Sequence, residues 1–174
     1  MNIIHYSKNG KFSEEILENA KDVVVAIDSQ CISSHQVTLP KMSKSKAHKA
    51  IPFALESQLL DEIDELNYTF LKSLTQNIWD VFVISKEILE NIENQLFIAK
   101  CSPVAIVPDF MLLPFSEGNI NYYEQDGFIK FRSATNQGGC LASKNFHALF
   151  ADCNLIKADF SYSSDNKVNI QTSN

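Results

Sequence analysis

The feature that most constrains the fold of this chain is VVVAI, the run from Val23 to Ile27. All five residues are apolar and three are β-branched valines. A strand with one face in water alternates polar and apolar residues, whereas a strand covered on both faces is apolar throughout. The run therefore predicts a buried central strand in a sheet.

The segment from residue 47 to residue 70 changes its period from that of a helix to that of a strand. Apolar residues recur every four positions in its first part, at Ala47, Ile51, Leu55, Leu59 and Ile63. This spacing predicts an amphipathic helix, in which Pro52 marks a kink or the start of a second segment because proline lacks a backbone donor. In the last part, Leu66, Tyr68 and Phe70 alternate with polar residues, which predicts a half-buried strand.

Further strands and helices alternate along the rest of the chain. The patterns predict strands over 3–6, 32–39, 78–84, 104–107, 120–123, 128–132 and 155–160. They predict helices over 14–20, with Ser13 as N-cap, over 85–99, beginning at Ser85, and over 143–150. A separate single helical turn is expected after Asp109, which would cap it. Asp126-Gly127 predicts a hairpin. This alternation indicates an α/β layered fold with a mixed sheet.

Charge and cysteine usage exclude several classes of protein. The net charge is −6 and the pI is near 5.2, which argues against a nucleic-acid binder. The cysteines at 31, 101, 140 and 153 share no CxxC spacing, so we expect reduced thiols in the cytosol. The N-terminus lacks the features of a secretory signal, and no run approaches the ~20 apolar residues that span a bilayer.

No motif for nucleotides, metals or nucleophilic catalysis is complete. AIDSQ, from Ala26 to Gln30, resembles the phosphate hairpin of actin-like ATPases, but lacks the glycine that lets a phosphate approach the backbone. Gly138-Gly139 is explained equally well by a phosphate contact or by an ordinary loop. The four histidines form no ligand spacing, and Cys140 with His35 or His147 lacks a surrounding signature. We therefore predict no catalytic residue, no cofactor and no metal.

An acidic cluster follows the predicted helix. Its candidate residues are Glu56, Asp61, Glu62, Asp64 and Glu65. Paired-carboxylate catalysis needs two groups on opposite sides of one bond, and calcium loops need a glycine, so neither chemistry fits this run. Lysines at the start of the helix and acids toward its end both oppose the helix dipole. We expect these carboxylates to serve recognition, as part of a partner-binding surface.

The order of segments resembles that of a known family. A strand ends in VTLP, a helix carries IPFALESQLLDEIDELNYTF, and WDVFVIS leads into another helix. VAIVPDFMLLP, a hairpin ending in FIKFRS, and NQGGCLASKNFHALF follow. This succession, from Val23 to Phe150, is similar to the cytoplasmic domain of the type II secretion system protein L (GspL) family. The most specific parts are Ile51–Phe70 and Val107–Pro114.

The resemblance implies an actin-like (ribonuclease H-like) mixed-sheet fold that has lost nucleotide hydrolysis, with a first lobe over 1–114 and a short or truncated second lobe over 115–160. Residues 161–174 are small or polar, and we expect a disordered tail there. The resemblance further implies a non-enzymatic adaptor at the cytoplasmic face of the bacterial inner membrane. On this reading the chain is a soluble fragment of a single-pass membrane protein.

The implied partners are the N-terminal domain of the type II secretion ATPase (GspE-like) and, through the full-length protein, platform proteins of the GspM-like and GspF-like kinds. The sequence leaves open whether the domain forms a homodimer. The alternative is an actin-like nucleotide-binding pilus or secretion assembly protein, akin to PilM, which rests on AIDSQ and NQGGC.

Overall fold

The first of three sheets formed by the described residues is parallel and contains the VVVAI run. In this computed structural model, residues 2–12, 20, 22–73, 75, 77–162 and 168–172 are described, the last five and 159–162 by their backbone alone. The sheet has the order β1-β2-β6, from β1 (Asn2–Tyr6), β2 (Val23–Ile27) and β6 (Ala105–Pro108). All five residues of β2 are buried, which confirms the predicted central strand.

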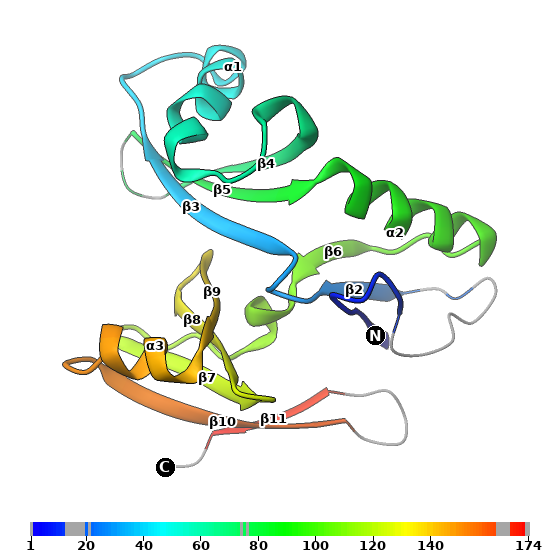
Figure 1. The fold of residues 1–174 in the computed structure, drawn as a ribbon, viewed down its shortest axis with the longest axis vertical. Coiled ribbons are helices and arrows are strands. Elements are labelled where there is room, and N and C mark those ends of the chain that lie inside the picture. The colour runs from blue at the N-terminus through cyan, green and yellow to red at the C-terminus, as the bar shows by residue number, and fades with distance from the viewer. Residues whose placement is uncertain are drawn as a thin grey trace.

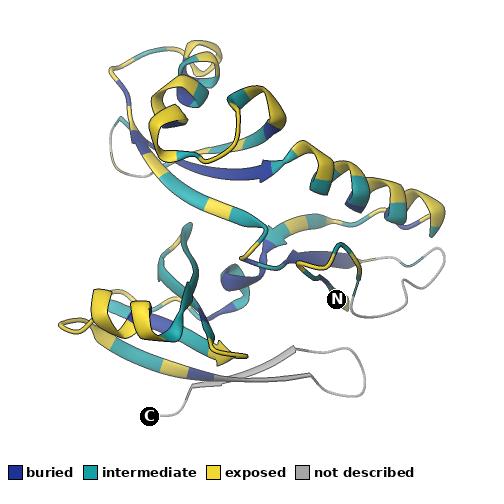
Figure 2. Cartoon of the chain, viewed as in Figure 1, coloured by how far each residue is buried: buried dark blue, intermediate teal, exposed yellow. Residues whose placement is uncertain are grey.

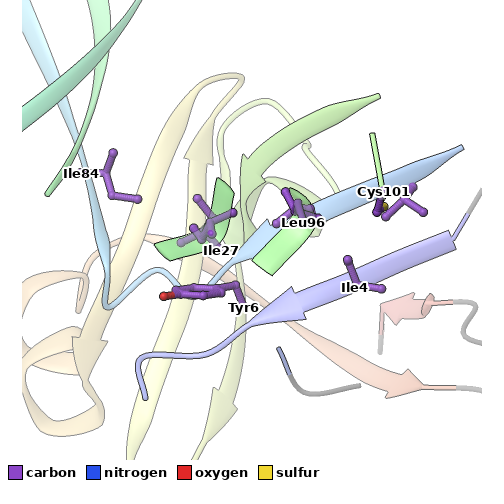
Figure 3. Close-up of a cluster of buried hydrophobic side chains, with 9 residues drawn as sticks. Ile4, Tyr6, Ile27, Ile84, Leu96 and Cys101 are labelled. Carbon is purple, nitrogen blue, oxygen red and sulfur yellow. The ribbon is translucent and has the colours of Figure 1, made fainter. Parts of the chain in front are cut away.

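Helix α2 (Lys86–Ile98) packs against this sheet and closes a hydrophobic core (Figure 3). Ile92 and Leu96 are buried there against side chains of β1 and β2, while Ile88 and Leu89 lie at the edge of the cluster. The helix predicted from Ser85 to 99 is therefore confirmed. Ser85 stands at the N-cap position, but its side chain makes no capping hydrogen bond.

The second sheet is antiparallel and lies under helix α1 (Lys44–Leu55), at the top of Figure 1. Its order is β3-β5-β4, from β3 (Ile32–Thr38), β5 (Ile78–Ser85) and β4 (Leu66–Lys72). Ala47, Ile51 and Leu55 are fully buried against the sheet, and α1 continues through Pro52 for three more residues.

The predicted helical stripe is wrong at its last two positions. After Leu55 the chain forms two short 3-10 turns, η1 (Glu56–Gln58) and η2 (Ile63–Glu65), and Leu59 between them is extended. The chain must reverse here so that β4 can start with Leu66 buried and run antiparallel to β5. A helix carried on to Ile63 would not allow that reversal.

The third sheet holds the second half of the chain and has the order β11-β10-β7-β8-β9. Its strands are β7 (Asn119–Gln125), β8 (Phe128–Ala134), β9 (Gln137–Ala142), β10 (Asn154–Tyr162) and β11 (Val168–Thr172), and α3 (Ser143–Leu149) packs on it. Asp126 and Gly127 have φ of 52° and 77°, the positive values of a two-residue hairpin turn, and join β7 to β8 as predicted.

Two further expectations concern the tail and Asp109. Within the tail expected to be disordered from residue 161, Ser161 and Tyr162 belong to β10 and residues 168–172 form β11, which pairs with it, while 163–167 and 173–174 lie outside the described residues. Asp109 does not cap a turn: it is the first residue of η3 (Asp109–Leu112), and Pro108 holds the N-cap position.

Two other expectations stay predictions. Most of the helix expected over 14–20 lies outside the described residues, and the division into lobes at residue 114 stays a prediction. No helix among the described residues is long and apolar enough to cross a membrane.

Candidate functional site

The turn that follows β2 is closed by hydrogen bonds to its first residue, Asp28. The Asp28 carboxylate accepts a hydrogen bond from the backbone N–H of Gln30 at 3.0 Å, and the Asp28 carbonyl accepts one from the N–H of Cys31 at 2.8 Å. This arrangement lets the chain turn from β2 into β3 without a glycine. The AIDSQ motif therefore forms a self-contained turn.

Asp109 ties this turn to the segment after β6. Its carboxylate is buried and accepts hydrogen bonds from both the backbone N–H, at 3.1 Å, and the hydroxyl of Ser29. The Ser29 oxygen in turn accepts a hydrogen bond from the N–H of Phe110 at 3.3 Å. Ile27 and Pro108 are paired in the parallel ladder, so Asp28 and Asp109 leave the sheet side by side at one edge.

Lys130 of β8 reaches both carboxylates from the third sheet. Its Nζ lies 2.5 Å from Asp109 Oδ2 and 3.4 Å from Asp28 Oδ1. Burial by itself would lower the pKa of Lys130, but the two carboxylates outweigh it and the pKa is raised. The lysine therefore stays charged and offsets one of the two negative charges.

A cleft of about 460 Å³ adjoins this cluster and is bordered by the loop after β1 and by the β7–β8 hairpin. Lys8 from that loop donates to Gln30 Oε1 at 3.3 Å and lies over the Phe128 ring. A phosphate would need free N–H donors at the turn, yet the N–H groups of Ser29, Gln30 and Cys31 already have partners. The residues of this turn do not fit a nucleotide phosphate.

Gly138 serves packing. The sequence allowed a loop or a phosphate contact for Gly138-Gly139, but both glycines lie in strand β9. A Cβ atom on Gly138 would lie 2.2 Å from the Phe131 carbonyl oxygen and 2.5 Å from the Phe110 ring. The Gly138 carbonyl accepts from the Ser34 hydroxyl, so this close approach joins β9 to β3.

The five acidic candidates are spread over the turns between α1 and β4. Glu56 begins η1, Asp64 and Glu65 end η2, and Asp61 and Glu62 lie in the connection between them. All five side chains are exposed (Figure 2 shows this segment largely in yellow). The structure thus brings them onto one exposed segment of ten residues, without assembling them around a common point.

Leu60 in the same segment is 104% exposed, the largest value among the exposed apolar residues. Together with Leu59 and Asp61 it borders a cavity of about 570 Å³ that Cys31, His35 and Cys140 line from other elements.

Two of the sulfur and imidazole groups considered from the sequence, Cys140 and His35, therefore share one cavity, but they do not form an activated pair. His35 Nε2 lies 2.8 Å from the Ser33 hydroxyl, and burial raises the pKa of Cys140 to about 11. A nucleophilic thiol requires a lowered pKa.

Comparisons with known proteins agree with one another. The family model "Type II secretion system (T2SS), protein L" matches residues 3–172. The chain belongs to this family. It is 32% identical over 127 residues to type II secretion system protein L of Dickeya chrysanthemi, covering 73% of this chain and 32% of that protein. It is 24% identical over 145 residues to the same protein of Pectobacterium carotovorum subsp. carotovorum, covering 80% and 33%. The chain thus spans about a third of these protein L relatives.

Solved structures show the fold of this protein L chain. The cytoplasmic domain of EpsL, an inner-membrane component of the type II secretion system of Vibrio cholerae, superimposes with a TM-score of 0.73 at 14% identity, covering 86% of this chain and 74% of that one. A PilM–PilN type IV pilus biogenesis complex gives 0.52 at 16% identity, covering 75% and 46%. The predicted actin-like α/β fold is confirmed.

Sequence reasoning missed the contacts of Lys130 and Asp109 and the full exposure of Leu60. Lys130 carried a weak signal, because it is a single charge between Ile129 and Phe131 in a hairpin strand. Its partners are 21 and 102 residues away along the chain, and nothing in the local pattern identifies them.

Proposed function

We propose that this protein L domain is a non-enzymatic scaffold that recruits the secretion ATPase to the inner-membrane platform of a type II secretion system. Membership of the family makes the protein a component of that system. The observation that carries the proposal is a contrast between two regions. The polar groups of the AIDSQ turn are paired internally, whereas the carboxylates of the acidic segment, residues 56–65, face outward together with Leu60.

An exposed leucine with a carboxylate rim has the composition of a docking surface. Apolar anchors that fill a pocket on the partner supply most of the affinity of an interface, and rim charges steer the encounter. Leu60 would be the anchor, and the five candidates would be the rim: Glu56, Asp61, Glu62, Asp64 and Glu65. The matching surface on the N-terminal domain of the ATPase would be an apolar pocket edged by lysine or arginine.

A calorimetric titration of this chain with the N-terminal domain of the cognate secretion ATPase tests the proposal. We expect Asp61→Lys/Glu62→Lys to weaken binding by about tenfold or more, and more strongly at low salt, since reversed rim charges repel a basic partner. Glu90→Lys/Glu93→Lys on the exposed side of α2 is the charge-matched control and should bind as the wild type does. The absence of binding at tens of micromolar would overturn the proposal.

Leu60→Ala separates the anchor from the rim. The side chain is fully exposed, so the free energy of unfolding should stay unchanged while affinity for the ATPase domain falls. An unchanged affinity would show that Leu60 is not part of the docking surface, and the carboxylates alone would then have to account for binding.

The alternative is a PilM-like nucleotide-binding assembly protein, which the fold likeness to the PilM–PilN complex and the 460 Å³ cleft favour. Thermal unfolding with ATP and magnesium decides between the two, because a ligand that binds the native state raises its melting temperature. A saturable rise would establish the alternative. The paired N–H groups of the turn lead us to expect none.

The wider assembly follows from the same proposal. The domain would lie at the cytoplasmic face of the inner membrane, and the full-length protein would cross that membrane once. GspM-like and GspF-like platform proteins and a second copy of this chain are the further partners that we propose. Co-purification of the full-length protein with each of them is the corresponding test.

A further inference from the structure

A small pocket lies at the end of the second sheet where α1 begins. It has a volume of about 280 Å³, and its lining includes Pro40, Met42 and Trp79 together with Lys41 and Lys72. Both lysines are exposed, whereas Trp79 is buried and so lies at the inner side of the pocket. The second sheet therefore ends in a hollow that has apolar side chains inside and two lysines at its border.

The positive charge at this end is not balanced within the described part of the chain. Lys44 and Lys46, in the first turn of α1, are exposed like Lys41 and Lys72, and none of the four forms an ion pair with another described residue. That first turn holds no acidic residue, and lysines placed there oppose the helix dipole. The electrostatics of the folded chain disfavour this arrangement, and an acidic partner would relieve it.

The acidic segment lies at the other end of the same layer (Figure 1). Helix α1 begins at Lys44 beside the pocket, ends where the acidic segment starts, and spans about 18 Å with its 12 residues. Strand β4 begins at Leu66, directly after the acidic segment, and ends at Lys72 in the lining of the pocket. One copy of the chain therefore cannot place its own Leu60 in its own pocket, but two copies can meet end to end.

We propose that the acidic segment of one copy docks on this pocket of a second copy, with Leu60 inside the pocket and the carboxylates against Lys41 and Lys72. Leu60 is fully exposed, and the five carboxylates around it are exposed as well. The pocket has the complementary composition, because it combines apolar side chains with lysines. Charge and apolar character therefore match between the two ends of the layer.

The contact joins two different surfaces, so it is heterologous and can continue from one copy to the next. It covers the segment that is proposed to bind the secretion ATPase, so self-association and ATPase binding exclude each other. The inference rests on the proposed docking role of residues 56–65, but its test needs this chain alone.

The size of the contact sets its strength. One apolar anchor with a rim of charges belongs among the small, transient interfaces, so we expect association at roughly tens to hundreds of micromolar. At an ionic strength of about 0.1 M the Debye length is ~10 Å. Repulsion between two chains of net charge −6 is then largely screened over longer distances, while charges in direct contact still attract.

Analytical ultracentrifugation of this chain tests the proposal. At about 0.1 M salt the average mass of the wild type should rise between roughly 20 and 500 µM, and at about 0.5 M salt it should return toward that of the monomer. Asp61→Lys/Glu62→Lys reverses the acidic side, Lys41→Glu/Lys72→Glu reverses the pocket side, and each variant alone should stay monomeric because like charges then meet. Leu60→Ala, which alters no charge, should weaken association by about tenfold.

A mixture of the two reversed variants shows whether the two surfaces meet each other. Each variant alone opposes like charges, but the equimolar mixture pairs opposite charges again and should associate as the wild type does. Glu90→Lys/Glu93→Lys has the same net charge as the acidic-side variant, since both replace two carboxylates by lysines on exposed positions. Mixed with the pocket-side variant, it should give no more association than it gives alone with the wild type.

Three results would overturn the proposal. The first is a wild type that stays monomeric at the highest concentration in about 0.1 M salt. The second is association that persists in both reversed variants, and the third is a mixture of these variants that stays monomeric although each has a native circular dichroism spectrum. None of these results bears on the calorimetric titration with the ATPase domain, so self-association and ATPase recruitment can fail separately.

Discussion

Two adjacent glycines give a sharp test of how the third sheet meets η3. Gly138 and Gly139 both lie in β9 and neither has a positive φ, so an alanine at either position meets no backbone strain. They differ only in their surroundings. A Cβ on Gly138 would lie 2.2 Å from the Phe131 carbonyl oxygen and 2.5 Å from the Phe110 ring, whereas a Cβ on Gly139 would lie 3.8 Å from its nearest neighbour.

The magnitude follows from these distances. Ordinary contacts between non-bonded carbons are about 3.5–4.0 Å, so Gly138→Ala requires a displacement on the order of 1 Å. Phe110 is fully buried in a hydrophobic cluster, so moving its ring disturbs the packing of its neighbours. Overpacking of this kind lowers the free energy of unfolding by about 1–3 kcal/mol. Gly139→Ala should instead be neutral or raise it by up to about 1 kcal/mol, by restricting the unfolded chain.

Urea unfolding of the two variants measures the difference. Far-UV circular dichroism and the fluorescence of Trp79, the single tryptophan, should give coincident transitions if unfolding is two-state. With a slope of about 1–3 kcal/mol per molar urea, the midpoints of the variants should differ by roughly 1 M. Equal midpoints would refute the packing role of Gly138.

Two other predictions concern α1 and the cysteines. Pro52→Ala restores a donor inside α1 and should raise the free energy of unfolding by roughly 1–2 kcal/mol in the same urea assay, whereas a loss of stability would show that the proline ring packs usefully. Burial raises the pKa of Cys31 and of Cys140 to about 11, so at pH 8 only ~0.1% of each is thiolate, and iodoacetamide followed by mass spectrometry should label exposed Cys153 first. Labelling of Cys31 as fast as Cys153 would contradict this.

Local pattern predicted the elements whose cause is local. Val23–Ile27 is apolar on every residue and therefore forms the buried centre of its sheet. Leu66, Tyr68 and Phe70 alternate with polar residues and form a strand with one face on the core. Asp126-Gly127 supplies the two positive φ values that a hairpin turn needs. In each case the deciding interactions lie within a few residues along the chain.

The end of α1 shows where local pattern fails. Leu59 and Ile63 continue the four-residue period, yet the helix stops at Leu55 because β4 must begin close by and pair with β5. Residues 168–172 look polar and loop-like, yet they pair with β10. Tertiary partners decided both segments.

The sequence by itself determined the layered α/β class, the buried central strand and an acidic segment between a helix and a strand. It also showed that no glycine opens the AIDSQ turn to a phosphate. Only the tertiary structure decided that Asp28, Asp109 and Lys130 meet, and that Gly138 marks a close approach to Phe110. The physical reason is that backbone propensity and periodicity are properties of neighbours in the chain, whereas ion pairs and close packing join residues up to about a hundred positions apart.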